Sequence, residues 1–297
     1  MFYLKERQDI KVTPEDFGNS FLNGEFSVIY HQTTEEFKQL ATINKFIEYG
    51  ESFNYGVETY NLEMSTNLNK NIKQYIWLDS KREKVISVSF DEDNIIHGLS
   101  LAPFVSYPES DRQYTQNTYI MPIKEEWFVF WGGTNQFINY HYLYDDQRYA
   151  YDLIIMKDGQ SYKDSINKNE NYYAFNKEIV APTDGKVVKV LDGIEDNVPG
   201  EMSPNQPEGN CVIIEHKNNE YSMLAHLKQN SILVKVGEIV QKGQVIGLCG
   251  NSGNSSEAHL HFQVMNSLDY LNGKSIRIRF EGDHEPIQGD FINPFKS

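Results

Sequence analysis

From about residue 123 onward, the chain consists almost entirely of short apolar runs separated by turns that contain glycine. Examples of the runs are EWFVFWGG, GKVVKVLDG, GNCVIIEH, YSMLAHL and HLHFQV, and examples of the turns are TDG, KVGE, QKGQ and CGNSGN. Short runs at such intervals are typical of antiparallel strands in a sandwich or a barrel. No longer segment recurs with shared residues, which argues against a solenoid. The sequence therefore predicts an all-β antiparallel domain over residues 123–297.

Residues 1–105 have a different pattern, in which helical signals come first and alternating strands follow. Thr13 and Pro14 predict a helix start, because threonine caps a helix and proline suits the first helical position. Thr33 and Glu36 have the spacing of a capping box. Further along, apolar and polar residues alternate, as in YNLEM and ISVSF, which is typical of strands. This order predicts an α+β domain, with helices on a curved antiparallel sheet.

The segment between these two regions, residues 106–122, is polar and lacks a clear period. These features predict a linker between two domains. A chain of 297 residues is long enough for two domains that each bury a core of their own.

The charge and the apolar pattern exclude several classes of partner. The formal net charge is −15, whereas nucleic-acid binding demands a basic surface. The same charge argues against tight binding to an anionic cell-wall polymer. No apolar run approaches the roughly 20 residues that a membrane-spanning helix needs. The N-terminus, MFYLKERQDIKV, has no basic segment followed by an apolar stretch, so we do not expect it to be a secretory signal.

The two cysteines, Cys211 and Cys249, lie in apolar strand-like segments. Neither has the CxxC or Cys/His spacing of a thiolate metal site. We expect two buried free thiols that pack as small apolar groups, with a disulfide as the alternative in an exported protein.

Histidines in the C-terminal half carry the chemical signal. His259 and His261 lie two residues apart in the strand-like run HLHFQV, so both side chains point to the same face. If that face is buried, both imidazoles need partners. The alternative interpretation is that the two rings lie on an exposed polar face. The preceding segment, GNSGNSSEA, is either a turn that lets backbone approach a ligand closely or a flexible hairpin.

Three further residues lie in suggestive contexts. His226 ends the apolar run YSMLAHL, where a lone histidine is more often structural. His141 lies eleven residues before Asp152, which directly precedes the apolar LII. A carboxylate beside a buried strand needs a partner, and a metal ion is one such partner. His216 precedes the turn KNNE and is expected to be exposed, and His284 matches no motif.

Together these segments resemble the lysostaphin-type (LytM-like) zinc endopeptidases, many of which cut peptide bonds in bacterial peptidoglycan. The resemblance covers about residues 125–265 and keeps the family order: GG before NYHY, then QRYAYDL, IVAPTDGKVVKVLDG, GNCVIIEH, MLAHL and VKVGEIVQKGQVIGLCGNSGNSSEAHLHFQV. It implies a zinc cofactor and a peptidoglycan peptide as substrate. The implied metal ligands are His141, Asp152 and His261, and the implied catalytic residues are His226 and His259.

One departure from the family concerns the carboxylate. Many members place the aspartate four residues after the first histidine, whereas here LYDDQRYAY is inserted between them. Asp145 and Asp146 are therefore rival candidates. We favour Asp152, because its context AYDLII matches the family strand while the rivals lie in a polar loop.

The resemblance also implies a mechanism. Two imidazoles and one carboxylate hold zinc with one position open, and zinc lowers the pKa of water toward about 7. No HExxH helix supplies a glutamate base, so His226 or His259 would act as the base and the other would stabilise the oxyanion.

Other interpretations remain beside this one. The first alternative is a catalytically inactive binding or regulatory protein with the same fold, and the second is a phosphocarrier of the sugar phosphotransferase type. The implied substrate predicts a location outside the cell or in the cell wall. Because we recognise no secretory signal in the sequence, a cytoplasmic location is the alternative. Residues 1–105 weakly resemble nuclear-transport-factor-like domains in the order of their elements. The sequence does not indicate an oligomeric state.

Overall fold

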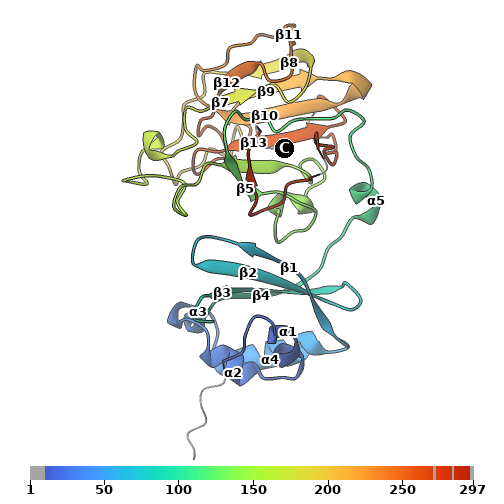
Figure 1. The fold of residues 1–297 in the computed structure, drawn as a ribbon, viewed down its shortest axis with the longest axis vertical. Helices are drawn as coiled ribbons and strands as arrows, with labels where there is room; N and C mark the ends of the chain where they lie inside the picture. Colours follow the sequence, from blue (N-terminus) through green and yellow to red (C-terminus); the bar gives the residue numbers. More distant parts are fainter. Residues whose placement is uncertain (1–10, 270–271, 283, 295–297) are drawn as a thin grey trace, which may run out of the picture. The chain divides into compact units, whose positions relative to one another are not determined.

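The computed structural model describes residues 11–269, 272–282 and 284–294. The chain divides into two compact units, residues 1–105 and 106–297, which are described separately below (Figure 1). Residues 1–10, on which most of the prediction about a secretory signal falls, lie outside the described residues. None of the helices in the described ranges combines the length and the apolar character that crossing a bilayer requires.

In the first unit, helices precede an antiparallel sheet, as predicted. The helices are α1 (Phe17–Leu22), α2 (Phe26–His31), α3 (Glu35–Leu40) and α4 (Ile43–Asn54). The sheet follows chain order, with β1 (Tyr60–Asn67), β2 (Ile72–Asp79), β3 (Lys84–Asp91) and β4 (Ile96–Pro103). Helices cover one face of this sheet (Figure 1), and aromatic residues such as Phe17, Phe21 and Trp77 fill the core between them. The resemblance to nuclear-transport-factor-like domains stays a prediction.

Two helix starts differ from the predicted ones. Helix α1 begins at Phe17, because residues 14–16 form a turn in which the amide of Asp16 donates to the carbonyl of Thr13. Helix α3 is capped by Thr34, whose side chain accepts a hydrogen bond from the amide of Phe37. Thr33 instead donates its hydroxyl to the carbonyl of Tyr30 and so closes the preceding helix.

The second unit contains two antiparallel sheets in its described residues. The larger sheet has the order β11-β8-β9-β10-β13-β6-β5-β14, and the smaller one pairs β12 with β7. The strands are β5 (Trp127–Trp131), β6 (Tyr151–Ile154), β7 (Glu178–Val180), β8 (Gly185–Leu191), β9 (Asn210–Glu215), β10 (Tyr221–Leu227), β11 (Ile239–Val240), β12 (Val245–Leu248), β13 (Leu260–Met265) and β14 (Phe291–Ile292). The short helix α5 (Pro108–Asp111) precedes these strands, and η1 (Tyr140–Leu143), η2 (Asn169–Asn171) and η3 (Lys217–Asn219) lie between them. One apolar core joins both sheets, since Ile179 and Ile246 of the smaller sheet cluster with Leu224 and Phe262 of the larger.

Residues 106–122, predicted to be a linker, are packed into the second unit. Tyr119 is fully buried, and its hydroxyl donates to the carboxylate of Glu220 at 2.8 Å. The same buried carboxylate accepts hydrogen bonds from the amides of Gln116 and Asn117. The segment lacks a strand period because two of its amides bond this side chain and others form scattered backbone bonds, as to Arg277 and Arg279, rather than a long strand ladder.

The start of this segment supports the loop that follows η1. The hydroxyl of Tyr142 donates to Asp111 Oδ2 at 2.8 Å, and the hydroxyl of Tyr149 donates to Asp111 Oδ1 at 2.8 Å. The guanidinium of Arg148 lies 3.4 Å from the centroid of the Tyr107 ring, which places a buried cation on an aromatic face.

We expect a shortened protein that begins at Ser106 to fold by itself. A protein that begins at Tyr114 should be less stable by roughly 1–3 kcal/mol, because the hydroxyls of Tyr142 and Tyr149 lose Asp111, their half-buried acceptor. Thermal unfolding of the two proteins would measure the difference. Insoluble protein from the longer version would mean that the two units depend on each other.

Candidate metal centre

Three of the predicted side chains meet at the middle of the larger sheet. Asp152 on β6 lies directly across from His261 on β13 in the antiparallel register. His141 comes from η1, and its ring centroid lies 5.0 Å from that of His261. One possible ligand atom from each of the three residues lies within 4.8 Å of the other two, and all three residues are buried. The strand register and the return of the loop after η1 therefore create one cluster.

His141 offers a free ring nitrogen to this cluster. Its side chain is fully buried, and Nδ1 donates to Asn139 Oδ1 at 2.9 Å. The other nitrogen, Nε2, has no hydrogen-bond partner among the described residues and lies 3.5 Å from Asp152 Oδ2. Burial lowers the pKa of His141 to about 3, so the ring is neutral and Nε2 carries a lone pair. A buried unpaired nitrogen is costly unless a ligand binds it.

Asp152 and His261 supply the negative charge and a second imidazole. Burial by itself would raise the pKa of Asp152, but the neighbouring His141, His259 and His261 lower it well below its usual range. Burial would lower the pKa of His261, but the hydrogen bond of 2.9 Å between its Nδ1 and Asp152 Oδ1 raises it overall. Two imidazoles and one ionised carboxylate are a donor set that fits a divalent zinc ion.

Two more histidines lie beside the cluster. The ring of His226 lies 4.7 Å from that of His259 and 5.8 Å from that of His261, measured between centroids. His226 Nδ1 donates to the carbonyl of Ser252 at 2.8 Å, and His259 Nδ1 donates to the carbonyl of Glu257 at 2.9 Å. Their Nε2 atoms are left for other partners, and that of His259 lies 3.8 Å from Asp152 Oδ1.

His226 has an unusual backbone conformation. Its φ angle is +61°, and the pairing of β9 with β10 shifts register between Leu224 and Leu227. A bulge of this kind turns one side chain away from the regular alternation. Strained non-glycine residues of this sort cluster at functional sites. Burial, followed by the neighbouring His259 and His261, also lowers the pKa of His226 well below its usual value, so the ring is neutral.

The rival aspartates lie outside the ligand cluster. Asp145 is exposed and forms ion pairs with Arg148 and Lys274. Asp146 lines the adjoining pocket, and its backbone carbonyl accepts a hydrogen bond from Gln263 Nε2 at 3.1 Å. Within the described ranges, the cluster that could hold a metal contains Asp152 and neither rival.

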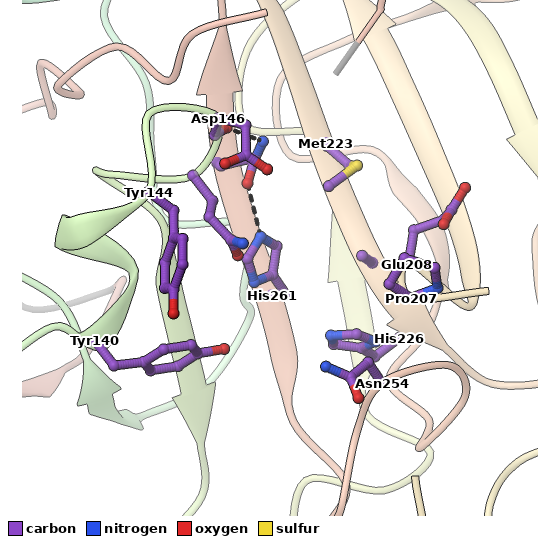
Figure 2. Close-up of a pocket in the computed structure, with 12 residues that line it drawn as sticks. Tyr140, Tyr144, Asp146, Pro207, Glu208, Met223, His226, Asn254 and His261 are labelled. Carbon is purple, nitrogen blue, oxygen red and sulfur yellow. Dashed lines mark hydrogen bonds between the residues drawn. The ribbon is translucent and has the colours of Figure 1, made fainter. Parts of the chain in front are cut away.

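A pocket of about 290 Å³ opens beside the cluster (Figure 2). Its lining includes His226 and His261 and the residues Tyr140, Tyr144, Asp146, Gln147, Pro207, Glu208, Met223, Ala225, Asn254 and Gln263. In Figure 2 the hydroxyl of Tyr140 points into this space, and its ring lies 4.0 Å from that of His141. Burial raises the pKa of Tyr140, and the charge of Asp152 raises it further, so the hydroxyl keeps its proton.

Sequence reasoning missed several of these residues. Tyr140 directly precedes His141 in the sequence. Gln263 lies two residues after His261, so strand alternation alone could have placed its side chain on the same face. Asn139 lies in the segment NYHY and Asn254 in the segment GNSGNSSEA, but the sequence predicted no role for either side chain.

The remaining predicted side chains lie elsewhere. His216, expected to be exposed, is buried, because Nδ1 bonds the carbonyl of Asp184 and Nε2 bonds Ser222 Oγ, both at 2.8 Å. His284 is paired with Asp290 at the surface. Cys211 and Cys249 are buried and free, which confirms the prediction of two packed thiols.

Residues 171–277, which lie within the second unit, match the model of Peptidase family M23. The matched range includes His226, His259 and His261. It begins after His141 and Asp152, which lie outside it.

Similar proteins include two peptidoglycan endopeptidases of Vibrio cholerae. The chain is 32% identical over 101 residues to peptidoglycan DD-endopeptidase ShyC, which is 34% of this chain and 22% of that protein. It is 43% identical over 65 residues to peptidoglycan DD-endopeptidase ShyA, which is 22% of this chain and 15% of that protein. The chain thus spans less than a quarter of the length of either relative.

Among solved structures, the antimicrobial peptidase lysostaphin from Staphylococcus simulans is similar with a TM-score of 0.31 and 20% identity. The match covers 51% of this chain and 47% of that one.

Proposed function

We propose that this chain is a zinc-dependent endopeptidase that cleaves peptide bonds of bacterial peptidoglycan. The observation that carries the proposal is the buried donor set of His141, Asp152 and His261. It lies beside a pocket that His226 lines, and the ring of His226 lies 4.7 Å from that of His259. The M23 domain and the similarity to peptidoglycan endopeptidases support this class of substrate.

In this proposal His141 Nε2, His261 and the carboxylate of Asp152 hold the metal. Zinc bound there would supply Lewis acidity, which activates water near neutral pH and polarises the scissile carbonyl. Both remaining histidines have Nδ1 occupied by a backbone carbonyl, so each presents Nε2 with a lone pair. His226 or His259 would accept a proton from water, and the ring that holds a proton would donate it to the leaving amine or to the developing oxyanion.

The pocket would hold the peptide beside these histidines. Tyr140 of η1 and Tyr144, which follows it, contribute aromatic surface. Pro207, in the loop before β9, and Met223, on β10, contribute apolar surface. An aromatic hydroxyl beside apolar surface suits a peptide chain, because peptides present both apolar groups and hydrogen-bonding groups.

The test is digestion of purified peptidoglycan by the zinc-loaded protein, with mass spectrometry of the released fragments. We expect new peptide termini that do not form with the His259→Ala variant. A protein that binds zinc and releases no fragments would favour the inactive binding protein instead. A protein that binds no zinc would refute the metal site itself.

The choice of carboxylate leads to a separate prediction. Asp152→Asn should weaken zinc binding by more than about 100-fold, since even partners outside the ligand set cost 10–100-fold when removed. Asp145→Asn and Asp146→Asn remove a carboxylate from the same segment and serve as matched controls that should keep zinc. Competition with a chromogenic chelator measures all three. Zinc loss in either control, with retention in Asp152→Asn, would assign the ligand to the polar loop.

A further inference from the structure

Two buried carboxamides contact the histidines of the metal-binding cluster directly. We propose that Asn139 and Gln263 are positioning residues, which make His141 and His261 present opposite ring nitrogens to the metal. The proposal rests on the metal site proposed above. It assigns a role to two residues that hold no metal themselves.

Gln263 determines which nitrogen of His261 carries a proton. Gln263 Nε2 donates to the backbone carbonyl of Asp146 at 3.1 Å, and a carbonyl can only accept. The amide oxygen must therefore be the atom that faces His261 Nε2, at 2.8 Å. An amide oxygen also only accepts, so His261 Nε2 must carry a proton. The nitrogen left for the metal is Nδ1, which faces Asp152 Oδ1.

Asn139 acts in the same way on His141 but selects the other nitrogen. Asn139 Nδ2 lies within hydrogen-bond distance of three backbone carbonyls, those of Gly133, Arg148 and Ala150. Its oxygen accordingly accepts from His141 Nδ1, and also from the amide of His141. The nitrogen left for the metal is Nε2, which is the buried atom without a partner.

Each carboxamide also fixes the direction of a ring. Rotation of His261 by half a turn about its Cβ–Cγ bond would exchange Nδ1 for a carbon atom and would break the bond to Gln263. Gln263 is buried on β13, so its amide oxygen has no access to bulk water as an alternative partner. In metal sites, partners of this kind hold the tautomer and orientation of histidine ligands.

The same two residues hold the loop between the first histidine and the aspartate. Asn139 bonds the carbonyls of Arg148 and Ala150 near the end of that loop, and Gln263 bonds the carbonyl of Asp146 near its middle. Each residue added to a loop brings conformational freedom. Hydrogen bonds that order the loop therefore help to hold His141 beside Asp152. The carboxamides thus connect the unusual spacing to the geometry of the ligands.

The decisive variant is Gln263→Leu, which keeps the approximate size of the side chain and removes the acceptor. Its control is Gln288→Leu, since Gln288 is also buried and donates to a backbone carbonyl, that of Phe130, but contacts no histidine. We expect zinc affinity to fall about 10–100-fold in Gln263→Leu relative to the control. Gln263→Glu keeps an oxygen that accepts from Nε2 and should restore most of this loss.

The wild-type protein provides a second readout, which matters because Asn139 variants lose three backbone contacts and can fail to fold. Nitrogen-15 NMR of histidine-labelled, zinc-loaded protein reports which ring nitrogen carries a proton. We expect one ligand histidine with the proton on Nδ1 and the other with the proton on Nε2. Coordination of both rings through the same nitrogen, or equal zinc affinity of Gln263→Leu and Gln288→Leu, would overturn the inference while leaving the metal site intact. Failure of the wild-type protein to bind zinc would overturn both.

Discussion

His261→Ala is expected to leave the purified protein with only a trace of zinc and with no detectable cleavage of peptidoglycan. His261 is one of only two imidazoles in the proposed donor set, and it also bonds Asp152 at 2.9 Å. Without it, the metal would keep only two protein ligands, whereas catalytic zinc sites use three. Elemental analysis of the dialysed protein measures the zinc, and the digestion assay measures the activity.

The control for this variant is His216→Ala. His216 is another buried histidine of the same unit, but it bonds Asp184 and Ser222 rather than the cluster. We expect His216→Ala to lose roughly 1–3 kcal/mol of stability from its broken hydrogen bonds and to keep its zinc. Stoichiometric, tightly bound zinc in His261→Ala would show that the ligand set is assigned incorrectly.

His226→Ala and His259→Ala are expected to show the opposite combination, with zinc retained and turnover lost. Neither residue belongs to the proposed donor set. Each presents Nε2 beside that set, where proton transfer or stabilisation of the oxyanion is typically worth about 10²–10⁴ in rate. The loss should appear mainly in kcat rather than in KM, because these interactions strengthen only in the transition state.

The backbone of His226 bears on how this result is interpreted. Its φ of +61° is strained for any residue with a Cβ, and alanine keeps the Cβ, so most of the strain is common to both residues. A rate loss in His226→Ala therefore reports the imidazole rather than a changed backbone. If both rings act in one proton-transfer step, the fold-reduction in kcat of the double variant should be smaller than the product of the two single fold-reductions. Activity close to wild type in both single variants would exclude them from the mechanism.

The fold of each unit was largely predictable because its signals are local. Alternation over HLHFQV places His259 and His261 on one face from strand geometry alone. The run YSMLAHL predicts the strand that carries His226, and helical signals correctly precede strands in the first unit. Hydrophobic period needs no knowledge of distant residues, which is why these elements could be predicted.

The bulge at His226 illustrates the limit of that reasoning. Regular alternation in β10 assigns each residue to a face, but the shift between Leu224 and Leu227 changes the assignment locally. The cause is contact with other parts of the chain: the amide of His226 donates to the carbonyl of Glu208, and its carbonyl accepts from the amide of Gly250. The hydrophobic alternation along β10 contains no information about Glu208 or Gly250.

By itself the sequence determined which residues could form the cluster, because it contains the residue types and the strand period that bring two histidines to one face. Only the tertiary structure decided which aspartate joins them and which side chains hold them. Asp145, Asp146 and Asp152 are chemically identical, and the path of the loop after His141 separates them. That path depends on Asn139 at the start of the loop, and on Gln263 and Asp111. The last two are distant in the sequence and lie close to the loop only after folding. Long-range hydrogen bonds of this kind leave no periodic trace in the chain, so no local pattern could have revealed them.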